Sequence, residues 1–184
     1  MSYEWEDIFK ESAGILALMG FIGVAGGFVL ESIEDQLLDA VILLFLIPIL
    51  NDVGGNLGAV LGARVSSALH TGRITPSFAD EELKENIWLM MGLGFLVFFL
   101  FGSAMFTVGF FIPLGLEASE IFTIVIGAGF ITIFLITIIT TVVALWAFKK
   151  GLDPDNIVIP VETTLCDFIG VVTLALMVWL VIIR

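Results

Sequence analysis

The chain has 184 residues, of which 59% are hydrophobic and only 14% are charged, and its formal net charge at pH 7 is −12. A soluble domain could not keep so much apolar surface away from water, and several apolar runs exceed the about 20 residues that cross a bilayer. The acidic balance excludes a nucleic-acid-binding protein, which needs a basic face. The single cysteine excludes a disulfide within the chain. These features predict a single transmembrane domain over residues 1–184, without a separate soluble domain.

Apolar runs separated by short polar segments predict five transmembrane helices, so the expected fold class is an all-α membrane protein. The first run contains Gly23 and Gly27, a pair of small residues that lets another backbone approach closely. The last run is preceded by a turn at residues 153–156. In chain order, the predicted spans cover residues 12–30, 37–70, 86–112, 119–148 and 155–183.

The second predicted span carries a proline, two glycines and three polar side chains between residues 47 and 56. Proline removes a helical hydrogen bond and a Gly-Gly pair adds backbone freedom, so we expect this helix to be broken. Irregular backbone at membrane depth is tolerated only inside protein or beside a water-filled cavity. One interpretation is that freed carbonyls and the segment carrying Asp52, Gly55 and Asn56 line an ion path. The other is a proline kink whose polar groups are satisfied.

An aspartate lies near the middle of the last predicted span. If that helix starts near residue 155, Asp167 lies about 18 Å along it, within a hydrocarbon layer about 30 Å thick. An ionised carboxylate there costs at least about 2.5–3.5 kcal/mol, so it should face protein, water or a cation. Thr163 and Thr164 lie one turn earlier on the same face. Together with Glu162, these residues form a polar segment that could exchange water for ligands.

The basic residues predict the orientation of the chain in the membrane. In the predicted topology six of the seven lie on one side, and Arg184 alone lies on the other. The positive-inside rule then places the N-terminus in the cytoplasm and the C-terminus outside, in the cell membrane. The outer loops are acidic and would concentrate cations. The six basic residues assigned to the cytoplasmic side are Lys10, Arg64, Arg73, Lys84, Lys149 and Lys150.

The chemistry available to this chain is that of oxygen ligands. No nucleophile–base pair is visible, and the only histidine, His70, lies at a helix end, so we do not expect an enzyme. Oxygen-only coordination suits hard cations such as Mg²⁺, Ca²⁺, Mn²⁺ or Na⁺. Mg²⁺ usually keeps several waters, so one carboxylate per chain could hold a hydrated ion. Two parallel chains around a twofold axis would present two Asp167 side chains to one ion.

Two motifs resemble a known family. Residues 48–58, PILNDVGGNLG, resemble the P-x-x-x-x-x-G-G-N-x-G signature in the second membrane helix of MgtE-type magnesium channels. Residues 63–68, ARVSSA, are closer to the related eukaryotic solute-carrier magnesium transporters. The last span, with Asp153-Pro154 followed by residues 163–170, TTLCDFIG, is similar to the family's D-P…T-T-x-x-D-x-x-G pattern. The resemblance covers the whole predicted five-span domain.

This resemblance implies a magnesium channel or transporter with Mg²⁺ as the transported ion. By that similarity Asp167 is the pore carboxylate, Thr163 contributes a backbone carbonyl to a central Mg²⁺ site, and Asn56 lines the path. The chain departs from the family at residues 59–60, Ala-Val, where MgtE proteins often have Thr-Gln, and in lacking the cytoplasmic regulatory domains. The alternative is a non-transporting membrane subunit whose Asp167 pairs with a partner protein.

Three questions stay open at the level of sequence. Conduction could be passive or coupled to Na⁺ or H⁺. The ion could be Mg²⁺ or another hard divalent cation. The pair could be a homodimer or this chain with a homologous one.

Overall fold

A computed structural model describes residues 5–183, with side chains from residue 13 onward except at positions 15, 155 and 156. Over this range the chain is helical and contains no strand, as the sequence predicts. A short π-helical turn, η1 (Trp179–Ile183), closes the described chain. The α-helices are α1 (Trp5–Glu31), α2 (Glu34–Asp39), α3 (Ile42–His70), α4 (Glu81–Gly109), α5 (Ala118–Lys149) and α6 (Pro154–Val178).

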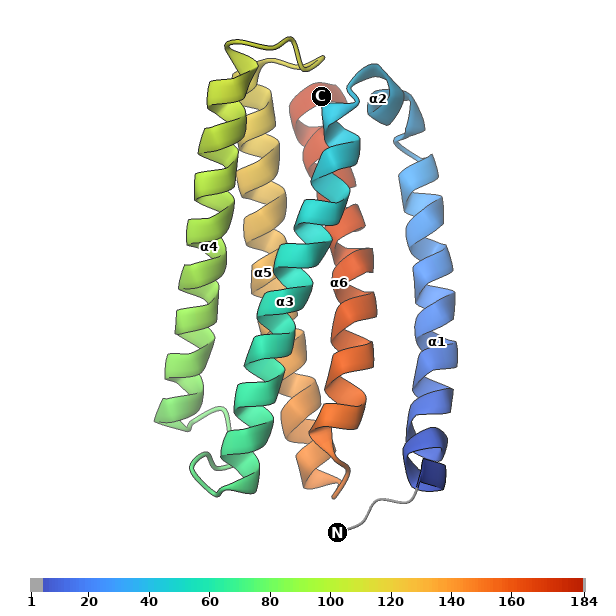
Figure 1. Ribbon diagram of the computed structural model, residues 1–184, viewed down its shortest axis with the longest axis vertical. Helices are drawn as coiled ribbons and strands as arrows, with labels where there is room; N and C mark the ends of the chain where they lie inside the picture. The colour runs from blue at the N-terminus through green and yellow to red at the C-terminus, as the bar shows by residue number, and fades with distance from the viewer. Residues whose placement is uncertain (1–4, 184) are drawn as a thin grey trace.

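Four segments within the described residues are long and apolar enough to cross a membrane: Ile42–His70, Glu81–Gly109, Ala118–Lys149 and Ile157–Ile183. The first predicted span falls on α1, which has 27 residues, or about 40 Å. Within the part of α1 whose side chains the structure describes without a gap, the apolar stretch is Leu16–Glu31, so the full length of this span stays a prediction. The long helices alternate in direction along the chain (Figure 1). The chain is therefore a multi-pass membrane protein.

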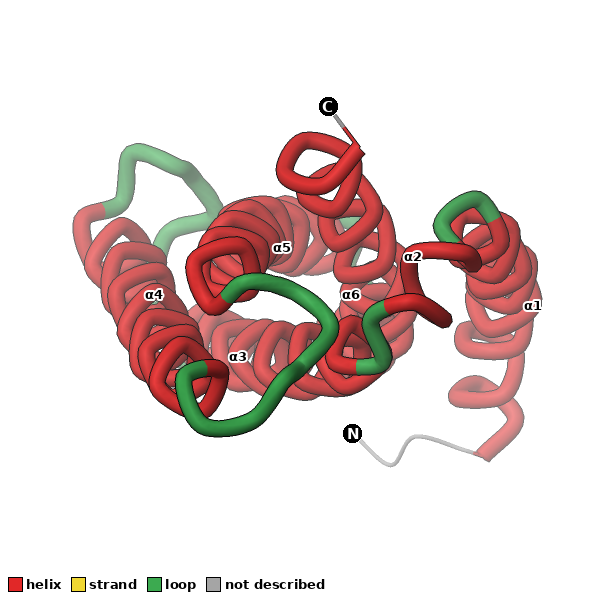
Figure 2. Tube along the Cα trace, turned by 90° about the horizontal axis from the view of Figure 1, so that it is seen from above, coloured by secondary structure: helices red, strands yellow, loops and turns green. Residues whose placement is uncertain are grey.

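The helices form a bundle in which α3, α5 and α6 are central. Helix α5 packs against α3, α4 and α6, and α6 packs against α1, α3 and α5. Figure 2 shows α4 and α1 at opposite sides of this central group. Helix α1 contacts the bundle chiefly through α6. Consequently α6, which carries Asp167, touches more elements than α1 or α4 does.

The prediction that the second span is broken is wrong. Helix α3 runs without interruption from Ile42 to His70, with Pro48 inside it. The break comes earlier, at residues 40–41, between the short α2 and α3. One proline costs a single helical hydrogen bond, and glycines inside the helix allow close contacts with other helices. For example, a Cβ at Gly62 would lie 2.6 Å from Val158 Cγ1 of α6.

Local sequence signals account for the C-terminal ends of α3 and α5 and for the start of α4. Gly72 and Gly151 have φ of +70° and +73°, the left-handed conformation that ends α3 and α5. The next residue in each case donates its N–H to a carbonyl five residues back, Arg73 to Ala68 at 2.9 Å and Leu152 to Ala147 at 3.1 Å. Asp80 caps α4 by accepting from the Leu83 N–H. These turns lie in the α3–α4 connection, residues 71–80, and in the α5–α6 connection, residues 150–153.

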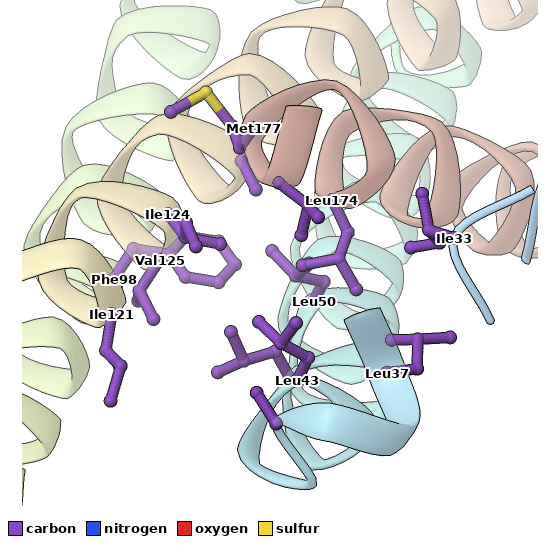
Figure 3. Close-up of a cluster of buried hydrophobic side chains, with 14 of the residues drawn as sticks. Ile33, Leu37, Leu43, Leu50, Phe98, Ile121, Ile124, Val125, Leu174 and Met177 are labelled. Carbon is purple, nitrogen blue, oxygen red and sulfur yellow. The ribbon is translucent and has the colours of Figure 1, made fainter. Parts of the chain in front are cut away.

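Buried apolar side chains form two main clusters. The larger lies toward the α2 end of the bundle and includes Leu43, Leu50, Phe98 and Leu174 (Figure 3). The second lies toward the other end and includes Leu61, Val65, Leu83, Leu145 and Val158. Between them lies a layer with buried polar groups: Glu162, and a hydrogen bond of 2.8 Å between the hydroxyls of Thr132 and Thr173. The polar residues of the candidate path lie at the same height.

The two ends of the bundle differ in charge. The loops after α3 and α5 lie at the same end as the start of α1, and α2 and the α4–α5 loop lie at the other (Figure 1). The first end carries charged residues of both signs: Arg73, Lys84, Lys149 and Lys150, and acidic residues at positions 80–85 and 153–155. The charged side chains described at the second end, from Glu31 to Asp39 and at Glu117 and Glu120, are all acidic. The fold thus places the α3–α4 and α5–α6 loops at one end of the bundle, as the count of basic residues predicted. Which side faces the cytoplasm stays a prediction.

Candidate functional site

A groove with a volume of about 470 Å³ lies between α3 and α6, at the level of the polar layer. On α3 the lining positions recur every three or four residues, which is one face of an unbroken helix. Asp52 lies about 15 Å from the start of α3, and Asp167 about 15 Å from the start of the span Ile157–Ile183. The lining residues are Pro48, Asn51, Asp52, Gly55, Asn56, Ala59, Thr163 and Asp167.

The α3 side of the groove carries a hydrogen-bonded pair. The side-chain amide of Asn56 donates to Asp52 Oδ1 at 3.0 Å, across one helical turn, and both side chains are exposed. This bond orients the Asn56 amide oxygen away from Asp52, because the amide nitrogen is the donor. Both residues therefore offer oxygen atoms to the groove. Pro48, on the same face, has no N–H, so the carbonyl of Leu44 lacks its helical donor.

The α6 side carries Thr163 and Asp167, one helical turn apart. The Thr163 hydroxyl donates to the carbonyl of Ile159 at 2.9 Å, and the Pro160 carbonyl lies 3.3 Å away. Since its proton is engaged with the backbone, the hydroxyl oxygen remains an acceptor. Asp167 is exposed in this single chain. Its carboxylate and the Thr163 oxygen thus lie on the same face.

The groove has a strongly negative character. Its lining contains two carboxylates, Asp52 and Asp167, and no lysine, arginine or histidine. A carboxylate at this depth is costly unless it meets water, a partner or a cation. Across the residues whose side chains the structure describes, no group of three or more His, Cys, Asp or Glu side chains could hold a metal ion.

Two of the predicted path residues lie outside this lining. Glu162 is 1% exposed and packs in the interior, where its carboxyl carbon lies 2.6 Å from the Cβ that a residue other than glycine would have at Gly58. Thr164 is half-buried. Of the predicted residues, the structure brings Asp167, Thr163, Asp52, Gly55 and Asn56 together in the groove and leaves Glu162 and Thr164 apart.

Three lining residues were not predicted as site residues: Pro48, Asn51 and Ala59. Asn51 also contacts α6, because its carbonyl accepts a hydrogen bond from the Cys166 thiol at 3.6 Å. The signal that could have found them is their helical spacing with Asp52, Gly55 and Asn56. The expected break in the helix hid this pattern.

Comparisons with known proteins point to one class of membrane protein. Residues 47–177 match the MgtE family, whose description is divalent cation transporter. The chain is 31% identical to solute carrier family 41 member 2 from Homo sapiens and from Macaca fascicularis, and 29% identical to that from Mus musculus. Each similarity covers 93% of this chain but 32% of the relative. The chain therefore spans about a third of the length of these curated relatives.

Proposed function

Because the chain belongs to the MgtE family of divalent cation transporters, we propose that it carries Mg²⁺ across the membrane along the groove between α3 and α6. The observation that supports this most directly is the pair of carboxylates, Asp52 and Asp167, in a groove at membrane depth with no basic residue in its lining. The oxygen ligands of the groove suit a hard divalent cation. Mg²⁺ is chosen because both sequence motifs resemble magnesium channels and transporters.

Each lining residue has a role in this proposal. Asp167 supplies the charge that holds the ion, and Thr163 supplies oxygen beside it. Asp52, Gly55 and Asn56 line the approach from α3. Since Mg²⁺ dehydrates reluctantly, these groups would bind through its remaining waters as well as directly.

The path is proposed to form between two parallel chains. The groove is open along one side of a single chain, and Asp167 is exposed there. A second chain related by a twofold axis would bring a second Asp167 to the same ion. Asp52 and Asp167 lie on different helices of one chain, whereas two Asp167 side chains related by the twofold axis could approach the ion from opposite sides.

The substitution Asp167→Asn tests the transport role. The amide keeps the shape of the side chain but removes its charge, so we expect Mg²⁺ flux into liposomes to fall by about tenfold or more, with folding unchanged. The control is Glu85→Gln, which removes an exposed carboxylate of α4 outside the groove and away from the acidic end. Wild-type flux in Asp167→Asn at equal incorporation would contradict the role. No Mg²⁺ flux with the wild-type protein would favour a non-transporting subunit.

A second measurement addresses gating. A potential of 100 mV drives a divalent ion inward with about 4.6 kcal/mol, so an ungated pore would be hazardous to a cell. We expect flux to depend on internal Mg²⁺ or on a Na⁺ or H⁺ gradient. The liposome assay varies these three quantities separately. Flux that follows only the electrochemical gradient of Mg²⁺ would show a pore without a gate.

A further inference from the structure

Glu162 is a buried carboxyl group without a hydrogen-bond partner. Its side chain is 1% exposed, and neither carboxyl oxygen bonds to any described residue. Burying such a group without a partner costs free energy, and a native protein rarely leaves one so. The described contacts of Glu162 therefore do not explain its presence in the interior of α6.

The position of Glu162 relative to the groove is specific. On α3, Gly58 makes room for its carboxyl group, and a Cβ at that position would overlap Glu162 Oε1 and Cδ. Gly55 is one turn earlier on α3 and lines the groove. A Cβ at Gly55 would lie 4.0 Å from Glu162 Oε1. The carboxyl group thus lies directly behind the part of the groove wall formed by Gly55.

Gly55 has no side chain, and outside the backbone of α3 the atom found within 4 Å of its Cβ position is Glu162 Oε1. Rotations about the three side-chain bonds of Glu162 can move its carboxyl group by a few ångströms without moving the helix. A divalent cation at Asp167 would supply the positive partner that this group lacks inside the protein. An ion bound at Asp167 could therefore attract the Glu162 carboxylate, which lies behind Gly55.

We propose that Glu162 is a second cation-binding carboxylate of each chain, which moves past Gly55 into the groove when a divalent cation is bound at Asp167. The proposal rests on the proposed function, because it assigns a further ligand to the same path. It makes the groove a site of two α6 carboxylates per chain. The number of charged ligands in an oxygen site sets its affinity for divalent cations.

The test is a double-mutant cycle on Mg²⁺ affinity, measured by calorimetry on purified protein in lipid nanodiscs. Glu162→Gln keeps the shape and removes the charge. Gly55→Ala adds a methyl group at ordinary contact distance, so the protein should fold while the space beside Glu162 is filled. Each variant should bind Mg²⁺ about tenfold more weakly. The double variant should be no weaker than either single one, since both block the same movement.

Controls separate this effect from a general loss of charge or helix flexibility. Glu85→Gln removes an exposed carboxylate, and Gly92→Ala adds a methyl group where no atom lies within 4 Å. Both should leave Mg²⁺ affinity unchanged. Wild-type affinity in Glu162→Gln or in Gly55→Ala, or losses that add in the double variant, would overturn the proposal. If Glu162→Gln does not fold, Gly55→Ala with wild-type affinity is sufficient to overturn it.

The same assay distinguishes the two proposals. Asp167→Asn should lose affinity whatever the role of Glu162. If Asp167→Asn binds weakly and Glu162→Gln binds like the wild type, the transport site stands and the second carboxylate is refuted. If the wild type does not bind Mg²⁺ at all, both proposals fail.

Discussion

At the scale of residues, glycines permit the close packing of α3, α4, α5 and α6. A Cβ at Gly54 would overlap the Cys166 thiol, one at Gly58 the Glu162 carboxyl group, and one at Gly94 would lie 2.7 Å from Ile133 Cγ1. Small residues at these positions let helices approach in a bilayer, where apolar burial alone does not drive association. Of these glycines, Gly58 leaves room for the Glu162 carboxyl group beside the groove.

Gly129→Ala tests this packing away from the path. A Cβ there would lie 2.6 Å from Phe98 Cδ2, a fully buried ring. Overpacking at such a site costs about 1–3 kcal/mol, so the unfolding temperature in detergent should fall. The matched control is Gly92→Ala, on an open surface, which should be neutral or stabilising by up to about 1 kcal/mol because alanine favours the helix. Equal stability of the two variants would refute the packing argument.

At the scale of elements, the start of α4 is held by one aspartate. Asp80 accepts hydrogen bonds at 2.9 Å from both the N–H and the hydroxyl of Thr75, and one at 3.2 Å from the Leu83 N–H. The Thr75 N–H, followed by its hydroxyl, lowers the pKa of the Asp80 carboxyl below its ordinary value of 3.8. The carboxylate thus joins the loop of residues 71–80 to the first turn of α4.

This capping predicts a dependence on pH. Because the folded-state pKa of Asp80 is lowered, its contribution to stability is present above pH 3.8 and is lost as the pH falls below that value. Asp80→Ala should raise the hydrogen-exchange rates of the Thr75 and Leu83 amides at pH 7. Acidification below pH 3.8 should lower the protection factors of these two amides, which correct for the slower intrinsic exchange in acid, in the wild type and should change them little in the variant. Unchanged protection in Asp80→Ala would contradict the assignment.

At the scale of the whole molecule, charge and polarity are arranged along the bundle axis. An acidic end with α2, a polar layer with the groove, and an end of mixed charge that includes Lys149 and Lys150 follow one another. Cations would be concentrated at the acidic end and would meet Asp52 and Asp167 at membrane depth. Entry of cations from this end is a prediction, because the predicted orientation places the α2 end outside the cell.

The proposed pair of chains is a prediction about assembly. In lipid nanodiscs, native mass spectrometry should find two copies of the chain per particle. Oxidation should link Ala59→Cys chains across the groove and should not link Gly92→Cys chains, at an open position of α4. The native Cys166 is buried, so it should not interfere. A monomer that transports at the full rate would exclude the dimeric path.

The amino-acid sequence alone determined the membrane class, most of the spans and the main polar residues. Hydropathy and span length are local properties, so four long helices appear close to where the apolar runs predict them. The polar positions Asp167 and Thr163 lie one helical turn apart, and that spacing sufficed to place them on one face. Family motifs around Pro48 and Asp167 indicated the class of transporter before any contact was known.

Only the tertiary structure decided whether α3 is continuous and where Glu162 lies. Pro48 and the Gly-Gly pair weaken a helix taken by itself, but α3 packs against α5 and α6 along its glycines and remains unbroken. Glu162 and Thr163 are neighbours in the chain, yet one is buried against Gly58 and the other lines the groove. The sequence shows only that both residues are polar. The contacts between helices determine which of them is buried and which faces the groove.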